Sequence, residues 1–198
     1  RRNEMGAVLT RVAEDSIAAG ELTTELAQAI ANYLGRKRAI AVRSWYRGMT
    51  LAVRSFELGE RARVGISALA PAGACDAIEE AGCEPVVLDV DSRLPVLASP
   101  LDVDYRRFAL DALIVDARYG YVPDLASFAE LGIPIIEDIS QGLGGNTGAT
   151  KLGQIGDLAL VGLEAQHIIT AGGGAVLCAA TSKRHSVLKQ ALEPTGSV

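Results

Sequence analysis

The clearest candidate for chemistry is a carboxylate that directly follows an apolar run. The segment IPIIEDISQ, residues 133–141, places Asp138 just after this run, and Gln141 follows three positions later. A carboxylate at the mouth of a buried strand is costly to desolvate unless it has a partner. Such an aspartate could cap the following helix, or it could hold a protonated ring nitrogen or a metal ion. The residues alone favour the helix cap.

A second candidate is His167, which lies between the apolar run Leu158–Gly162 and the glycine-rich segment AGGGA, residues 171–175. Histidine can act as a general base near neutral pH, although a lone histidine is more often structural. The glycines could cradle a phosphate, but they lack the GxGxxG and GK[ST] spacings. A tight turn between two strands explains them equally well.

The segment SWYRG, residues 44–48, follows an earlier apolar run and opens a predicted helix. Backbone amides at the start of a helix can bind an anion. Trp45 and Tyr46 are large residues for a phosphate loop, so packing or partner contact is the favoured interpretation.

Seven short apolar runs position these residues, and amphipathic stretches separate several of them. Such alternation predicts an α/β domain with a largely parallel sheet, whose ligands collect at the carboxyl ends of the strands. The last two runs are too close for a crossover helix, so they either form an antiparallel pair or lie apart in the sheet. The predicted strands are Ala39–Val42, Arg63–Ile66, Pro85–Val90, Ala112–Val115, Ile133–Ile136, Leu158–Gly162 and Ala175–Leu177. The predicted helices are Val8–Ala19, Leu22–Leu34, Met49–Phe56, Ala72–Ala81 and Pro123–Leu131.

Composition indicates a globular protein with one sizeable core. The chain has 198 residues, of which 49% are hydrophobic and 22% charged, and its net charge is -5. No basic face dominates, so nucleic acid is not an expected partner, and the basic clusters at residues 36–38 and 183–185 are interpreted as solvated ends of elements. The three cysteines lack CxxC spacing, which indicates reduced thiols and no metal site. With no signal peptide and no run long enough to span a bilayer, we expect a cytoplasmic protein without membrane contact.

Several short segments resemble, in one consistent order, the large domain of the DegT/DnrJ/EryC1/StrS sugar aminotransferases. This family has the fold-type-I architecture of enzymes that use pyridoxal 5'-phosphate (PLP). The resemblance implies a three-layer α/β domain with a mixed, mainly parallel seven-stranded sheet. It also implies a helical arm over residues 1–20, a large domain over 21–198, and a C-terminal small domain that is absent or truncated. The matching segments are AGCEPVVLDVD (81–91), RYGYVPDL (118–125), IEDISQGLGG (136–145), LGQIGDLAL (152–160) and TAGGGAV (170–176).

The resemblance assigns a cofactor, PLP, and four residues that would bind it. Asp138 falls where the family's aspartate pairs with the pyridine nitrogen and keeps the ring an electron sink. Gln141 falls where a side chain contacts the ring hydroxyl, and Ser140 falls where a small residue packs on the ring face. Ser44 takes the first position of the family's phosphate-binding Ser-Gly-Thr motif. The resemblance implies no metal.

Other positions depart from the family's pattern. Trp45 and Tyr46 replace the glycine and threonine of the phosphate motif, and Gly162 replaces a serine that contacts the phosphate. His167 falls at the position of the lysine that forms the Schiff base. An imidazole forms no stable imine with an aldehyde, so covalent attachment of PLP and ordinary transimination are expected to be lost.

Two functions are therefore compatible with the resemblance. In the first, the chain lacks ordinary transaminase activity, with PLP retained or lost, and acts as a structural or regulatory partner. In the second, it binds PLP or its amine form, PMP, noncovalently and uses His167 as the base of a sugar aminotransferase or a keto-deoxysugar dehydratase. A dehydratase of this family carries histidine at the lysine position. The altered phosphate motif favours the first function. The resemblance also implies a homodimer, or a heterodimer with an aminotransferase relative, with Trp45 and Tyr46 beside the interface, and a nucleotide-sugar ligand.

Overall fold

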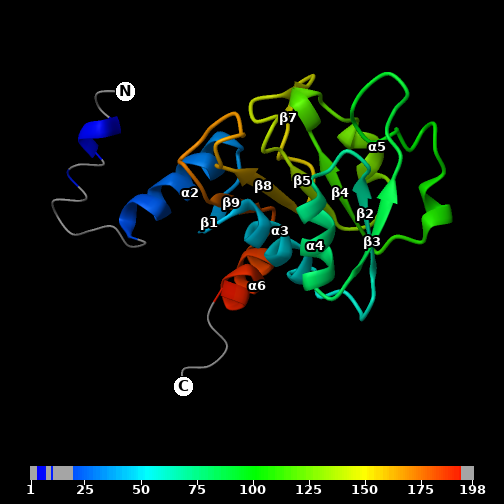
Figure 1. Cartoon of the computed structure of the whole chain (residues 1–198), viewed down its shortest axis with the longest axis horizontal. Coiled ribbons are helices and arrows are strands. Elements are labelled where there is room, and N and C mark those ends of the chain that lie inside the picture. The colour runs from blue at the N-terminus through cyan, green and yellow to red at the C-terminus, as the bar shows by residue number, and fades with distance from the viewer. Residues whose placement is uncertain (1–3, 8–9, 11–19, 193–198) are drawn as a thin grey trace.

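The computed structural model describes residues 4–7, 10 and 20–192, and a seven-stranded sheet forms the centre of this part (Figure 1). The strand order is β1-β9-β8-β5-β4-β2-β3. All neighbours are parallel except β9, which runs antiparallel to both β1 and β8. The predicted mixed, mainly parallel sheet is confirmed, and the last two strands form the antiparallel pair. The strands are β1 (Arg38–Val42), β2 (Arg63–Ser67), β3 (Glu84–Leu88), β4 (Ala112–Asp116), β5 (Ile135–Asp138), β8 (Leu158–Gly162) and β9 (Ala175–Ala179).

Helices cover both faces of the sheet and give three layers (Figure 1). On one face α3 (Trp45–Arg54), α4 (Ala72–Glu80) and α6 (Ser182–Leu192) enclose an apolar core that includes Ile114. On the other face α2 (Glu21–Tyr33) and α5 (Leu125–Ala129) pack over Leu113 and Val115. Successive residues of a strand point to opposite faces, so central strands buried on both faces read as continuous apolar runs. The short elements β6 (Asn146–Thr147), β7 (Thr150–Lys151), η1 (Tyr105–Phe108) and η2 (Arg118–Gly120) lie in the connections.

Helix α3 starts four residues earlier than predicted, at Trp45. The hydroxyl of Ser44 accepts a hydrogen bond from the Arg47 amide at 3.1 Å and caps the helix. Gly48 lets this helix approach the sheet closely, because a Cβ there would lie 2.8 Å from the Leu160 side chain. These two features place Trp45 at the carboxyl edge of the sheet.

A buried carboxylate joins strand β5 to the loop before β8. Glu137 is fully buried and accepts hydrogen bonds from the amides of Gly153, Ile155 and Gly156. Arg36 donates to the carbonyl oxygens of Gly153 and Gly156 and lies 3.9 Å from the Glu137 carboxylate. Burial raises the pKa of Glu137, whereas the three amides and Arg36 lower it. The cluster therefore fixes the loop against the end of α2.

Two sequence predictions about basic residues are wrong. Arg36 and His185 were expected at solvated ends, but their exposed fractions are 8% and 9%. Arg36 turns inward to the Glu137 cluster, and His185 lies on the inward face of α6, a helix that was not predicted. The predicted helix Val8–Ala19 lies outside the described residues except for Thr10, as does most of the predicted arm 1–20. Among the described helices, none has both the length and the apolar character needed to cross a membrane.

Candidate functional site

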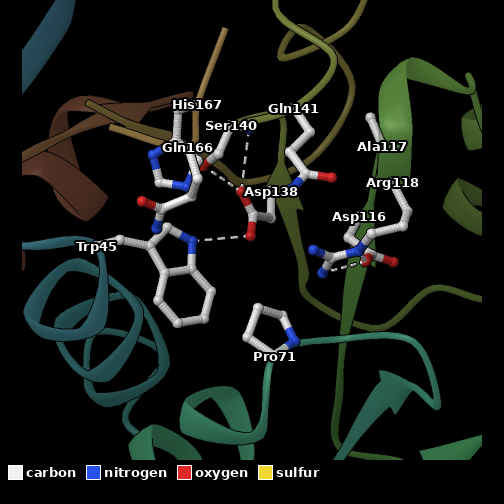
Figure 2. A pocket seen from close by; sticks show the side chains of 10 residues that line it. All are labelled: Trp45, Pro71, Asp116, Ala117, Arg118, Asp138, Ser140, Gln141, Gln166 and His167. Atoms are coloured by element: carbon white, nitrogen blue, oxygen red, sulfur yellow. Dashed lines mark hydrogen bonds and ion pairs between the residues drawn. The ribbon is translucent and has the colours of Figure 1, made fainter. Parts of the chain in front are cut away.

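A small cavity opens where the carboxyl ends of β4 and β5 meet the loop after β8 and the start of α3 (Figure 2). Its volume is about 100 Å³. The structure brings together four of the predicted site residues here. The fifth, Ser44, does not line the cavity and instead caps α3. The lining residues are Trp45, Pro71, Asp116, Ala117, Arg118, Asp138, Ser140, Gln141, Gln166 and His167.

Both carboxylate oxygens of Asp138 have partners from the chain itself. The indole Nε1 of Trp45 donates to Oδ2 at 2.8 Å, and the Ser140 amide and hydroxyl donate to Oδ1 at 3.1 and 2.5 Å (Figure 2). Asp138 and Trp45 are 6% and 7% exposed. Hydrogen bonds between these side chains compensate for the cost of burying the carboxylate. Trp45 is therefore packed within the chain, as one of the two interpretations predicts, and its place beside an interface stays a prediction.

His167 packs directly on the backbone of Gly162. A Cβ at Gly162 would overlap the imidazole ring and approach the Ser140 hydroxyl to 2.9 Å. The same hydroxyl accepts a hydrogen bond from the Gly162 amide at 2.7 Å. The Nδ1 of His167 accepts a hydrogen bond from the Glu164 amide at 3.1 Å. Because a backbone amide can only donate, the neutral imidazole carries its proton on Nε2.

A carboxylate of the chain lies at the N-terminus of α3. The Trp45 amide donates to Oε1 of Glu164 at 3.1 Å, and the side-chain amide of Gln166 donates to Oε2 at 2.9 Å. The free amides and the dipole of a helix favour an anion at this end. Glu164 therefore satisfies, within the chain, the anion preference predicted for SWYRG.

Sequence reasoning missed a buried ion pair in the cavity wall. Arg118 donates a hydrogen bond from Nε to Oδ2 of Asp116 at 2.9 Å, and a terminal nitrogen forms an ion pair with the same oxygen at 2.7 Å. Burial raises the pKa of Asp116, Arg118 opposes this shift, and the nearby Asp138 adds to it. The other oxygen of Asp116 is buried without a hydrogen-bond partner among the described residues. Asp116 ends β4, so the rule that ligands gather at strand ends was the available signal.

The remaining polar groups of the cavity are only partly used in hydrogen bonds within the chain. Gln141 accepts a hydrogen bond from the Tyr119 amide at 2.9 Å through its side-chain oxygen, which leaves its amide nitrogen free to donate. Chemically, the cavity presents two carboxylates, a guanidinium and an imidazole around a small volume. Such a set can bind and orient a small polar group. Among the described residues, no cluster of three or more potential metal ligands is present.

Comparisons with known proteins agree on one family. A sequence model of the DegT/DnrJ/EryC1/StrS aminotransferase family matches residues 1–190. GDP-perosamine synthase of Caulobacter vibrioides is 26% identical over 170 residues, which cover 80% of this chain and 44% of that protein. Helicobacter pylori PseC, an aminotransferase, superimposes with a TM-score of 0.85 at 18% identity, covering 93% of this chain and 51% of its own. DesV of S. venezuelae superimposes with a TM-score of 0.84 at 24% identity, and the match covers 99% of this chain and 54% of DesV. The chain thus spans about half the length of these relatives.

Proposed function

Because the chain belongs to the DegT/DnrJ/EryC1/StrS aminotransferase family, we propose that it is a member whose cofactor site is filled by its own side chains and that it lacks ordinary transaminase activity. The hydrogen bond between Trp45 and Asp138 carries this proposal. By its resemblance to the family, Asp138 is the residue that would hold the pyridine nitrogen of PLP. In this chain an indole N–H lies on that carboxylate instead.

The N-terminus of α3, where the Glu164 carboxylate lies, supports the same proposal. By resemblance, residues 44–46 stand at the phosphate-binding motif, and Glu164 lies at the helix N-terminus that this motif begins. A carboxylate there repels a phosphate group and already uses the Trp45 amide. The side chain of Trp45 also fills space that a glycine at this position would leave open.

Size and chemistry add a third argument. Small-molecule sites usually measure about 300–1,000 Å³, whereas this cavity measures about 100 Å³ and no lysine lines it. We infer that His167 stands at the lysine position, so the site lacks the primary amine that would form a Schiff base with PLP. As they stand, these residues do not fit PLP, which supplies an electron sink when it is bound in the family.

The alternative function is noncovalent use of PLP or PMP with His167 as base. The proximity of Asp138, Gln141 and His167 in one cavity favours it. A base needs a free lone pair directed at the substrate, but the neutral His167 ring holds its proton on Nε2 while Nδ1 faces the Glu164 amide. The first proposal therefore has the stronger support.

The test compares four proteins: the wild type, Trp45→Ala, His167→Lys and the double variant. Each is dialysed against PLP, reduced with borohydride, and assayed for bound cofactor by absorption and peptide mass analysis. We expect no stoichiometric binding to the wild type or to His167→Lys, since Trp45 still occupies the site. Any restored binding should require Trp45→Ala. Saturable, stoichiometric binding of PLP to the wild type would contradict the proposal.

We also propose that the chain acts as a homodimer or as a heterodimer with an aminotransferase relative. The supporting observation is an apolar cavity of about 340 Å³ lined by Ala29, Ile30, Tyr33, Leu143 and Ile169. Tyr33 and Ile169 are each about half exposed, and contiguous exposed apolar surface often marks an interface. The substitution Ile169→Asp should lower the mass measured by light scattering. An unchanged monomer at all concentrations, with no relative bound, would argue against both assemblies.

A further inference from the structure

A second cavity lies away from the candidate site, at the outer edge of the sheet. Its volume is about 460 Å³, and none of its lining residues lines the first cavity. Its lining residues come from α2, from the edge strand β1 and the residue before it, and from α6. The volume falls within the range of about 300–1,000 Å³ that is typical of small-molecule sites. The cavity is therefore large enough for a ligand of metabolite size.

Basic side chains dominate this second cavity. Lys37 and Arg38 line it at the start of β1, and Lys189 lines it from α6. Among its described lining residues there is no aspartate or glutamate, although the chain as a whole has a net charge of -5. Concentration of one charge sign in a concave site raises the local potential and attracts ions of the opposite sign. The cavity is therefore complementary to an anion.

The α2 side of the cavity supplies groups that suit phosphate oxygens. Thr23 and Thr24 line the cavity from the first turn of this 13-residue helix. The helix has no side-chain cap, because Gly20 occupies the N-cap position. The acidic Glu21 stands in the same turn, so the basic residues rather than the helix dipole make the cavity complementary to an anion.

His185 is a titratable group beside these basic residues. Its side chain lines the cavity and is only 9% exposed, and its Nδ1 atom is buried with no hydrogen-bond partner among the described residues. Burial lowers the pKa of His185, and the positive charges of Lys189 and Arg38 lower it further. A bound anion in the cavity would offset the effect of these two charges, so His185 can report binding.

We propose that this cavity binds a small molecule through a phosphate or pyrophosphate group. Lys37, Arg38 and Lys189 would neutralise its charge, and His185 lies in the same cavity wall. The proposal is independent of whether the first cavity holds a cofactor.

The experiment uses the full chain and inorganic pyrophosphate as the probe. The chain has only two histidines, so the imidazole resonances of His185 and His167 can be assigned in an NMR spectrum by a single His185→Asn substitution. We expect a saturable shift of the His185 resonance and a rise in its pKa, while His167 in the first cavity stays unchanged. A shift of His167 alone, or of neither, would overturn the proposal.

Two lysines on α6 give a matched pair of variants. Lys189→Ala removes a lining charge, whereas Lys183→Ala removes an exposed charge of the same helix outside the cavity. Loss of one charge-assisted contact should weaken pyrophosphate binding about tenfold in Lys189→Ala, and Lys183→Ala should stay within about twofold of the wild type. Equal weakening by both substitutions would show unspecific attraction by net charge and would refute a built site. Sulfate at equal concentration should bind more weakly, and equal binding of sulfate would overturn the assignment of a phosphate group.

Discussion

Replacing Trp45 by phenylalanine should destabilise the fold through one buried atom of Asp138. Phenylalanine keeps an aromatic ring in place but lacks the indole N–H, which lies 2.8 Å from Oδ2. That oxygen belongs to a residue only 6% exposed, so water cannot simply replace the donor. An unpaired buried acceptor costs about 1–3 kcal/mol, and more when it is charged. With the smaller ring volume added, we expect a loss of about 2–4 kcal/mol in the free energy of unfolding.

The measurement is urea unfolding followed by far-ultraviolet circular dichroism, because the substitution removes the only tryptophan. A double-mutant cycle with Asp138→Asn isolates the pair, and we expect a coupling energy of at least about 1 kcal/mol. Tyr119→Phe serves as the control, since this side chain is 67% exposed and its loss of a hydroxyl should cost less than about 0.5 kcal/mol. If Trp45→Phe costs no more than this control and shows no coupling, the bond does not stabilise Asp138 and the reasoning fails.

Three further predictions follow from other contacts. The substitution Gly162→Ala should displace the His167 ring, because the new Cβ overlaps it, and a changed chemical shift of this imidazole would report the displacement. Arg36→Met should lower the free energy of unfolding by about 3–5 kcal/mol, since it leaves the buried Glu137 carboxylate without its cation; a loss below about 1 kcal/mol in chemical denaturation would contradict this. Burial raises the pKa of the Cys178 thiol to about 12, so only about 10⁻⁴ of it is thiolate at pH 8; mass analysis after brief alkylation should find it unmodified while the two half-buried cysteines react.

The sheet could be predicted because its strands are buried on both faces. The run at Ile135 and Ile136 reads as a strand from composition alone, and the polar residues after it fall at the sheet edge by geometry. Asp138 could thus be singled out, and so could the position of His167. The sequence pattern around such residues is enough to predict their place, because each follows its strand closely in the sequence.

Contacts between distant parts of the chain could not be predicted in this way. The partner of Asp138 is Trp45, 93 residues away, and Arg36 finds its carbonyl partners 117 and 120 residues away. A basic residue beside two others looks solvated unless those partners are known. The same reason hid the burial of His185, since the inward face of α6 packs against the distant strand β1 only in the complete fold.

The contact between Gly162 and His167 limits the order in which the sequence can change over time. Any side chain at Gly162 meets the imidazole in its present position, so a serine can enter there only after His167 has changed or turned away. A lysine introduced first at position 167 would find Trp45 still bonded to Asp138. Each single step toward the family's pattern therefore loses a packed contact before a new one forms. On the proposed function, this interlocking makes return to the ancestral site improbable by single substitutions, and ancestral reconstruction should find these positions changing together.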